Sequence, residues 1–307
     1  MVAEVLTQFS PYVSAWFSEA LGVPTPPQSE GWPPIQRGEN TLILAPTGSG
    51  KTLAAFLWGI DEIYRELAEQ QDEAEAGVRL LYISPLKALN NDIERNLRHP
   101  LDGIRSMAIR LGYKLPALSV AVRTGDTPAG ARVSMAKHPP HILITTPESL
   151  YLLLTSPRAR DMFRSIRTVI VDEIHTLCGN KRGVHLSVSL ERLEHFAGRR
   201  VQRIGLSATQ KPLEEVARFL GGQTPVDIGY VPRPVTIVNT GYKKALDLEV
   251  VTVVKDFKDM PADAIWPSVI PRVLQDILRH QSTLVFCNNR RLAERTADRL
   301  NAQIEAE

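Results

Sequence analysis

The glycine-rich segment APTGSGKT, residues 45–52, constrains the fold of this chain more than any other feature. It follows the apolar run TLIL and precedes the helix-forming run LAAFLWGIDEIY, so a strand, a loop and a helix come in the order that a phosphate-binding loop requires. Glycines in such a loop let successive backbone N–H groups turn toward anionic oxygens, and the helix start adds further unpaired N–H groups. We expect a nucleotide's phosphates to lie against Thr47, Gly48, Ser49, Gly50, Lys51 and Thr52.

Two side chains of this loop and a downstream pair of carboxylates account for the predicted chemistry. The Lys51 ammonium should reach the β- and γ-phosphates of ATP, and the Thr52 hydroxyl should hold Mg²⁺. The segment TVIVDEIH, residues 168–175, is an apolar strand that ends in two adjacent carboxylates. We expect Asp172 to hold Mg²⁺ and Glu173 to act as the general base on the attacking water. The predicted catalytic residues are therefore Lys51, Asp172 and Glu173, and the predicted metal ligands are Thr52 and Asp172.

Apolar runs alternate with helical segments along most of the chain. The expected strands are 41–45, 79–84, 118–123, 141–145, 168–172 and 201–207. The expected helices are 51–69, 87–98, 128–137, 148–155, 184–196 and 212–220. Because the strands are apolar on both faces, the pattern predicts an α/β fold with a doubly wound parallel sheet, whose ligand site lies beyond the carboxyl ends of the strands.

The character of the chain changes after GGQTPVDIGYVPRP, residues 221–234. Two extended stretches are expected at 235–242 and 246–254, followed by a helix near 267–280, a strand at 282–288 and a helix at 290–301. We therefore expect one domain over residues 1–233 and the start of a second α/β domain over residues 234–307. A lone parallel strand cannot bury both of its faces, so the second domain is expected to be truncated or to need a partner chain.

Composition excludes several classes of protein. Hydrophobic residues make up 43% and charged residues 23% of the chain, which excludes wholesale disorder. Two cysteines exclude a disulfide scaffold and fit a reducing compartment. No apolar run reaches the roughly 18 residues of a membrane-spanning helix, and the first residues lack the basic region of a secretory signal. We expect a soluble, cytoplasmic protein with no membrane partner, whose net charge of +2 permits a polyanionic partner without requiring one.

Together, the phosphate-binding loop and the DEIH segment resemble the superfamily-two DEAD/DEAH-box helicases. Further segments in the expected order resemble the large helicase-related (Lhr) family, namely PTPPQSEGWPPIQRGEN, SPLKALNNDIERNL, VRTGDTP, TTPESLYLLLTS, SAT and STLVFCNNRRLAERTADRLN. The resemblance covers nearly the whole chain. It implies a RecA-like P-loop NTPase domain with an N-terminal Gln motif over residues 1–233, and an incomplete second RecA-like domain over residues 234–307.

The resemblance also implies roles for residues outside the catalytic set. Gln28 is expected to form hydrogen bonds with the adenine edge of ATP. Without the resemblance to the family, a solvated glutamine in a loop is the alternative interpretation of this residue. Three strand–helix loops and one helix start are expected to contact a nucleic-acid backbone, through Pro85, Lys87, Arg123, Thr124, Gly125, Thr146, Pro147, Glu148, Asn289 and Arg290. Each loop alone favours an ordinary strand–helix connection, and it is the array of three loops that favours binding. A solvated helix face with i,i+4 pairs is the alternative for the charges after residue 290.

Four further residues are expected to couple the two sites. His175 follows the carboxylate pair, and Ser207, Ala208 and Thr209 follow the next strand, where small hydroxyls would relay the state of ATP to the nucleic-acid loops. The alternative for this SAT segment is a cap for the helix at 212–220.

The sequence thus predicts an ATP-dependent helicase or translocase of Lhr type, with ATP and Mg²⁺ as cofactors. The resemblance implies 3′ to 5′ movement along single-stranded or partly duplex nucleic acid, DNA rather than RNA. Later helicase motifs, including an arginine finger, are not found after residue 301, so a missing C-terminal half or a partner chain is expected to complete the enzyme. The alternatives are an ATP- and nucleic-acid-binding module without unwinding activity, and a P-loop kinase or unrelated ATPase.

Overall fold

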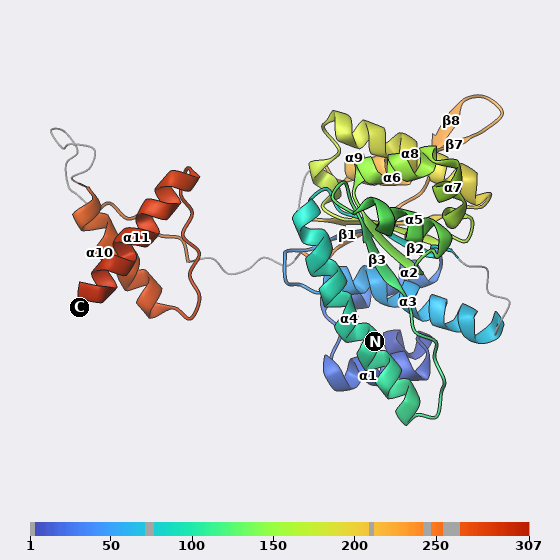
Figure 1. The fold of residues 1–307 in the computed structure, drawn as a ribbon, viewed down its shortest axis with the longest axis horizontal. Coiled ribbons are helices and arrows are strands. Elements are labelled where there is room, and N and C mark those ends of the chain that lie inside the picture. Colours follow the sequence, from blue (N-terminus) through green and yellow to red (C-terminus); the bar gives the residue numbers. More distant parts are fainter. Residues whose placement is uncertain (1–3, 71–76, 209–211, 242–246, 254–264, 307) are drawn as a thin grey trace. The chain divides into compact units, whose positions relative to one another are not determined.

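The computed structural model describes residues 4–70, 77–208, 212–241, 247–253 and 265–306. The chain divides into two compact units, Met1–Tyr242 and Lys243–Glu307 (Figure 1). The first unit holds a sheet of seven strands in the order β3-β4-β2-β5-β6-β1-β9, and every neighbouring pair in that sheet is parallel. The predicted α/β fold with a parallel sheet is confirmed.

The strands of this sheet are short, and all but the two edge strands are buried along nearly their whole length. They are β1 (Thr41–Leu44), β2 (Leu80–Ile83), β3 (Val120–Arg123), β4 (Ile142–Thr145), β5 (Thr168–Val171), β6 (Gln202–Ser207) and β9 (Thr236–Asn239). The first six lie within the predicted ranges. Side chains along each strand alternate between two apolar clusters, so that in β2 Leu80 and Tyr82 face one cluster while Leu81 and Ile83 face the other.

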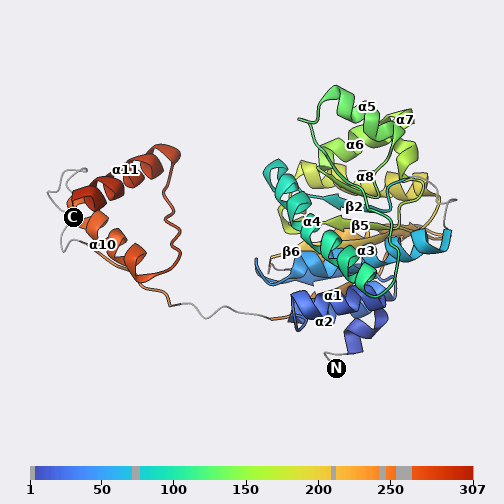
Figure 2. The ribbon, with the colours of Figure 1, turned by 60° about the horizontal axis from the view of Figure 1, so that its bottom comes forward.

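Helices cover both faces of the sheet, as Figures 1 and 2 show. One face packs against η1 (Glu4–Gln8), α1 (Pro11–Ala20), α2 (Pro26–Gln36), α3 (Lys51–Gln70) and α4 (Lys87–Arg110). The other packs against α6 (Pro147–Thr155), α7 (Pro157–Arg160), η2 (Asp161–Phe163), η3 (Ile174–Thr176), α8 (Lys181–Ala197) and α9 (Leu213–Gly221). The remaining helix, α5 (Ala129–Lys137), buries none of its residues.

One helix is much longer than the sequence predicted. The prediction ended it at residue 98, just before Pro100, but α4 continues to Arg110 with Pro100 inside it. Leu101, Ile104 and Ala108 of the added turns are buried in the cluster that α1 also joins. Tertiary packing therefore extends the helix past a residue that ordinarily ends one.

The second domain was predicted to begin at residue 234, nine residues before the second unit begins at Lys243. Residues 236–239 form β9, which pairs with β1 as the seventh strand of the first unit. Before β9, the chain makes an antiparallel hairpin of β7 (Gln223–Pro225) and β8 (Tyr230–Pro232), which the sequence did not predict. Pro225, Pro232 and Pro234, which precede the predicted boundary or lie at it, therefore belong to the first unit.

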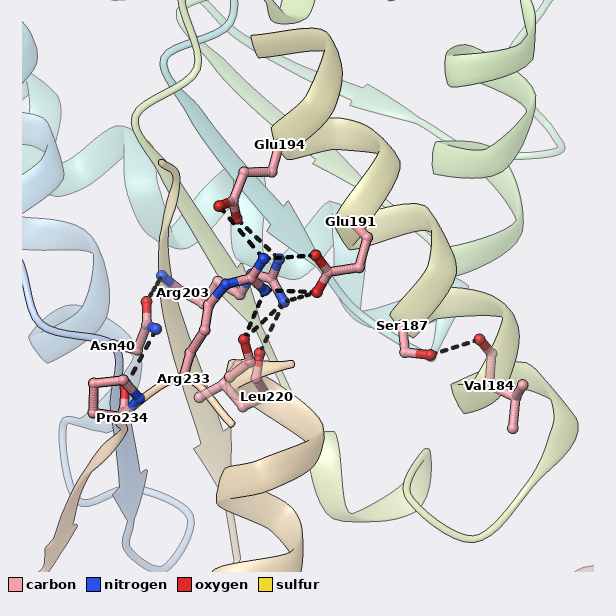
Figure 3. A network of polar contacts seen from close by, with 10 residues as sticks. Asn40, Val184, Ser187, Glu191, Glu194, Arg203, Leu220, Arg233 and Pro234 are labelled. Carbon is pink, nitrogen blue, oxygen red and sulfur yellow. Dashed lines mark hydrogen bonds and ion pairs between the residues drawn. The ribbon is translucent and has the colours of Figure 1, made fainter. Parts of the chain in front are cut away.

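A network of charges holds the segment before β9 in place (Figure 3). Arg203 of β6 is buried and pairs with Glu191 at 3.1 Å and Glu194 at 3.0 Å, both on α8. Arg233 pairs with Glu191 at 2.7 Å and donates to the Gly221 carbonyl at the end of α9. Because cations at a helix C-terminus are favoured, these arginines also stabilise α9.

The described residues of the second unit form two helices, α10 (Trp266–Arg279) and α11 (Arg290–Ala306), which pack through Ile270, Leu274 and Leu300. The strand predicted at 282–288 is wrong: these residues form no strand, and Leu284 and Phe286 are 84% and 90% exposed. A strand needs a neighbour to pair with, and the described residues of this unit form no other strand. The extended stretch predicted at 246–254 is also not a strand over its described residues, 247–253.

Candidate nucleotide and nucleic-acid site

The phosphate-binding loop lies between β1 and α3, at the carboxyl end of a central strand. Gly48 and Gly50 have φ of 80° and 84°, in the left-handed region where a side chain is disfavoured. Thr47 and Gly48 are exposed at the tip of the loop, and Ser49 is half-buried. The loop therefore has the backbone form that the sequence predicted for it.

The structure brings Lys51 and Glu173 together, although 122 positions of sequence separate them on two different strands' loops. The Lys51 side chain is 8% exposed, and its ammonium lies 3.7 Å from a Glu173 carboxylate oxygen. It also donates to the Ala45 carbonyl at 3.3 Å. One basic and one acidic side chain thus converge at the mouth of the phosphate-binding loop.

Asp172 lies at the end of β5 with both carboxylate oxygens engaged. Its Oδ1 accepts from the Glu173 backbone N–H at 2.9 Å, and its Oδ2 accepts from the Tyr82 hydroxyl of β2. Burial, and then the neighbouring Asp172 charge, raise the pKa of Tyr82, so this hydroxyl keeps its proton and donates. Tyr82 was missed from the sequence, where its place in an apolar strand indicated only a core aromatic.

Glu173 has φ of 45°, and it is the one described residue other than glycine in the left-handed region. A side chain costs about 1–2 kcal/mol in that conformation. The turn directs Glu173 toward Lys51 while Asp172 bonds Tyr82. Strain of this kind concentrates at functional sites.

Three of the four predicted coupling residues form a line of contacts that begins at the Glu173 carboxylate. The His175 ring lies 3.5 Å from Glu173, and its Nδ1 is 3.1 Å from the Ser207 hydroxyl at the end of β6. The Ser207 hydroxyl also donates to the Ala208 carbonyl at 2.7 Å, and the Ser207 carbonyl accepts from Ala45 of the phosphate-binding loop. A continuous set of contacts therefore joins β5, β6 and β1. Thr209 lies outside the described residues.

Gln28 lies against the phosphate-binding loop from α2. Its Nε2 donates to the Gly50 carbonyl at 3.4 Å, and its Oε1 accepts from the Thr25 backbone N–H at 2.9 Å. The Thr25 hydroxyl in turn donates to the Ser49 carbonyl at 2.8 Å. Thr25 and Gln28 form the capping box of α2. The T-x-x-Q spacing was a signal for this box that the sequence prediction did not use.

The donors near the loop fit Mg²⁺ when phosphate oxygens complete its coordination. A carboxylate has about four lone-pair positions, and the two hydrogen bonds to Asp172 leave the others for a metal. Thr52 is half-buried in the first turn of α3. The described residues contain no group of three or more histidines, cysteines or carboxylates that could hold a metal by themselves. Thr52 and Asp172 are the residues that would hold the ion, together with phosphate oxygens of the nucleotide.

The three predicted nucleic-acid loops lie at one edge of the sheet, because β3, β4 and β2 are parallel neighbours. Thr146 caps α6 by accepting from the Ser149 N–H at 3.3 Å, which also fixes Pro147 and Glu148 in its first turn. Pro85 is buried just after β2, and Lys87 begins α4. Thr124 and Gly125 follow β3.

Arg182 connects two of these loops and was missed from the sequence. From the first turn of α8 it bonds Glu148 at 2.6 Å and the Pro85 carbonyl at 2.9 Å. Burial raises the pKa of the Glu148 carboxyl, but the bond from Arg182 and the other contacts outweigh this and lower it overall. The spacing of these residues in the sequence does not indicate the contact, because Pro85, Glu148 and Arg182 lie in three separate segments that folding brings together.

The remaining predicted residues lie elsewhere. The Arg123 side chain is buried on the α6 face of the sheet, where it lines a cavity and donates to the Thr124 carbonyl. In the second unit, Asn289 caps α11 by accepting from the Leu292 N–H at 2.9 Å, and the exposed Arg290 pairs with Glu294 at 3.1 Å. Within the second unit these two residues therefore serve their helix.

With this geometry in place, comparisons with known proteins become informative. A family model described as DEAD/DEAH box helicase matches residues 25–218. Lhr helicase/probable uracil glycosylase of Mycolicibacterium smegmatis is 50% identical over 305 residues, covering 99% of this chain and 19% of that protein. ATP-dependent helicase Lhr-Core protein 2 of Thermococcus barophilus is 47% identical over 285 residues, covering 93% of this chain and 32% of that protein.

A solved structure agrees with these relatives. Helicase Lhr of Mycobacterium smegmatis, bound to ssDNA and AMP-PNP, matches with a TM-score of 0.84 and 49% identity over 98% of this chain and 36% of that one. The chain spans 19% and 32% of the lengths of the two curated relatives. No described helix is both long enough and apolar enough to cross a membrane. The resemblance found in the sequence is confirmed: the chain belongs to the DEAD/DEAH box helicase family.

Proposed function

We propose that this chain binds ATP with Mg²⁺ and couples ATP hydrolysis to 3′ to 5′ movement along single-stranded or partly duplex nucleic acid, DNA rather than RNA. It would do so as the ATP-binding part of an Lhr-type helicase, in the cytoplasm, where its free Cys178 and Cys287 would stay reduced. The observation that carries the proposal is the line of contacts from Lys51 through Glu173 and His175 to Ser207.

The residues of the phosphate-binding loop and the adjoining Glu173 suit phosphoryl transfer from ATP to water. Gly48, Gly50 and the start of α3 supply backbone N–H groups for the phosphates, and Lys51 supplies a positive charge. Bound Mg²⁺ would neutralise charge that develops on the phosphate oxygens. Glu173 would accept a proton from the attacking water, because its left-handed turn directs it to the mouth of the loop.

The nucleic-acid part of the proposal is supported by the loops after β2 and β4. Helix starts present N–H groups that bind backbone phosphates without reading base sequence. Two such starts, those of α4 and α6, adjoin one another through Arg182. The DNA preference is supported by the similar Lhr structure, which is bound to ssDNA.

ATP hydrolysis by this chain, measured as phosphate release with and without oligo-dT or oligo-U, tests the proposal. We expect stimulation by the oligonucleotide, a larger effect of oligo-dT, and loss of turnover in Lys51→Ala and Glu173→Gln. Lys114→Ala and Glu215→Gln change exposed side chains of the same types outside the site and serve as controls. Turnover that survives Lys51→Ala would contradict the mechanism. ATP binding without stimulated turnover would instead indicate the binding module without unwinding activity.

A further inference from the structure

A cavity of about 670 Å³ lies on the α6 face of the sheet, between α5 and the α6–α7 segment. Pockets of this size hold small organic ligands in many proteins. The α5 wall packs loosely, because that helix buries none of its own residues, whereas the opposite wall includes the buried Leu153 and Met162. None of the chemistry proposed for the ATP site uses this space.

Positive charge gathers around the cavity without compensation. Four cationic side chains line it, namely Arg123, Arg132, Lys137 and Arg158. Among the described ion pairs within 4.0 Å none includes any of the four. The single acidic residue of the lining, Asp161, pairs with Arg164 at 3.2 Å. The cavity thus has an excess of positive charge that a bound anion would balance.

Arg123 is the strongest indication that an anion belongs there. It is 6% exposed and lies at the end of β3, where the alternation of side chains places it on the α6 face with the cavity. Its guanidinium donates to the Thr124 carbonyl, and burial, followed by the charge of Arg132, lowers the pKa of Arg123. A buried charge is costly unless an opposite charge or strong acceptors pair with it.

Apart from Ser156, the rest of the lining is apolar. Leu152 and Val133 are 52% and 57% exposed, although both border the cavity, and Met135 and Met162 add flexible thioether side chains to its walls. Methionine adapts its shape to varied ligands and makes favourable contacts with aromatic rings. A ligand for this cavity therefore needs an apolar or aromatic body as well as an anionic group.

We propose that this cavity is a binding site for a small amphipathic organic anion, with its apolar or aromatic body against Leu152 and Met162 and its phosphate, sulfonate or carboxylate group among Arg123, Arg132, Lys137 and Arg158. The site goes beyond the proposed ATP-driven activity. It borders one predicted nucleic-acid loop, because Arg132 donates to the Gly125 and Thr127 carbonyls at 2.7 Å each.

The site is tested with 8-anilinonaphthalene-1-sulfonate, a fluorescent aromatic sulfonate, and with N-phenyl-1-naphthylamine, its uncharged counterpart. We expect saturable binding of the sulfonate, at least about tenfold tighter than the neutral probe. The double substitution Lys137→Glu with Arg158→Glu should weaken binding of the sulfonate by about tenfold or more. It should leave the affinity for the neutral probe little changed. Both positions are exposed, so the fold should survive, and unchanged thermal melting would verify this.

Matched controls separate the cavity from other apolar surface. Arg199→Glu with Arg200→Glu makes the same charge change outside the lining and should not alter binding, whereas Leu152→Glu should abolish it. Equal binding of both probes, or sulfonate binding indifferent to Lys137→Glu with Arg158→Glu, would overturn the proposal.

A further arm identifies the source of the anion. Displacement of the sulfonate by oligo-dT from the unsubstituted protein, in a manner that a nucleoside monophosphate reproduces, would identify the terminal nucleotide of a strand as the occupant. Displacement by the monophosphate alone would identify a free small molecule. Either pattern supports the cavity as an anion site. If neither compound displaces the sulfonate at saturating concentration, the occupant is not a nucleotide but another organic anion of the same class.

Discussion

Of the two glycines in the phosphate-binding loop, Gly50 has less room for a side chain than Gly48. A Cβ built there would lie 2.7 Å from Gln28 Nε2 and 3.0 Å from Thr25 Oγ1, whereas one built on Gly48 would meet nothing within 4 Å. Both glycines have left-handed backbones. We expect Gly48→Ala to cost about 1 kcal/mol of unfolding free energy from backbone strain alone, and Gly50→Ala about 2 kcal/mol, because the capping box of α2 is lost as well.

Urea denaturation of the two variants and of Thr25→Ala checks this difference. Thr25→Ala removes the capping hydroxyl without touching either glycine, and should account for most of the gap between the two glycine variants. If Gly48→Ala and Gly50→Ala were equally stable, the predicted clash of a side chain at position 50 with Gln28 and Thr25 would be contradicted.

Tyr82→Phe tests the contact between β2 and Asp172. The substitution removes one hydroxyl that donates to Asp172 and keeps the ring, which stacks on Phe56 at 5.1 Å. We expect a loss of about 1–2 kcal/mol of unfolding free energy, because a buried carboxylate oxygen loses its partner. We also expect weaker Mg²⁺-dependent ATP binding, measured by titration with a fluorescent ATP analogue with and without Mg²⁺. A Tyr64→Phe variant, at another buried tyrosine away from Asp172, is the control.

At the scale of single residues, the sequence predicted those residues whose chemistry depends on the spacing of their neighbours in the chain. The phosphate-binding loop and the DEIH segment each require only a few consecutive residues and a strand before them. Tyr82 and Arg182 escaped prediction because their roles depend on which strands and loops are neighbours. That order, with β2 beside β5, arises only from the topology of the sheet.

The first turn of α8 joins two of the three predicted nucleic-acid loops. Its Arg182 bonds both Glu148 and the Pro85 carbonyl. We expect Arg182→Ala to raise the oligonucleotide concentration that gives half-maximal ATPase stimulation by about threefold to tenfold, because the side chain that bonds both loops is removed. Turnover at saturating oligonucleotide should change little. The pair is exposed, so unfolding free energy should change by less than about 1 kcal/mol.

Arg182→Lys serves as the matched variant, since it keeps the charge but not the forked geometry that reaches two acceptors. A partial defect in Arg182→Lys would support the geometric role. A fall in turnover at saturating oligonucleotide, with unchanged half-saturation, would instead place Arg182 in catalysis and contradict its assignment as a positioning residue.

Elements were predicted well where burial on both faces makes a strand unmistakable, as in 41–45 and 168–172. They were predicted poorly where partners decide the outcome. The run STLVFCN has the composition of a strand, yet with no neighbouring strand among the described residues of its unit it remains irregular. The same dependence on partners lengthened α4 beyond Pro100.

Across the first unit, the charges of Glu191, Arg203 and Arg233 make stability depend on pH. Burial raises the pKa of the Glu191 carboxyl, but the Arg233 bond and the Arg203 charge outweigh it and lower the pKa below its ordinary value of 4.5. A carboxyl with a lowered pKa binds protons more weakly in the folded than in the unfolded chain. Its stabilising contribution is therefore complete above that ordinary value and is lost as the pH falls below it.

Glu191→Gln should accordingly destabilise the protein at pH 7 by about 1–2 kcal/mol, a figure reduced for a side chain that is 41% exposed. Thermal melting from pH 7 to pH 3 should show the variant and the unsubstituted protein converging as the solution becomes acidic. Glu215→Gln, which removes an exposed surface pair with Arg218, should show no such trend. A gap that stays constant down to pH 3 would contradict the assignment.

The boundary between the two units depends on contacts between residues that are distant in the sequence. The sequence prediction placed the division at residue 234, where the pattern of expected elements changes. Arg233 and Asn40 instead fasten this segment to β6 and α8, with the Asn40 amide donating to the Pro234 carbonyl at 3.4 Å. Such distant contacts are invisible to a prediction from the local sequence pattern.

The pairing of β1 with β9 also bears on how the protein is made. Thr41 pairs with Thr236, so the strand that leads into the phosphate-binding loop gains one of its two neighbours from residues about two hundred positions later in the chain. As the ribosome extends the polypeptide, β1 remains a sheet edge until β9 has emerged. Contacts of such sequence separation slow folding, and the unpaired edge offers a template for aggregation in the meantime. The nucleotide site is thus among the last parts of the first unit to be completed, even though its signature motif is among the first to be synthesised.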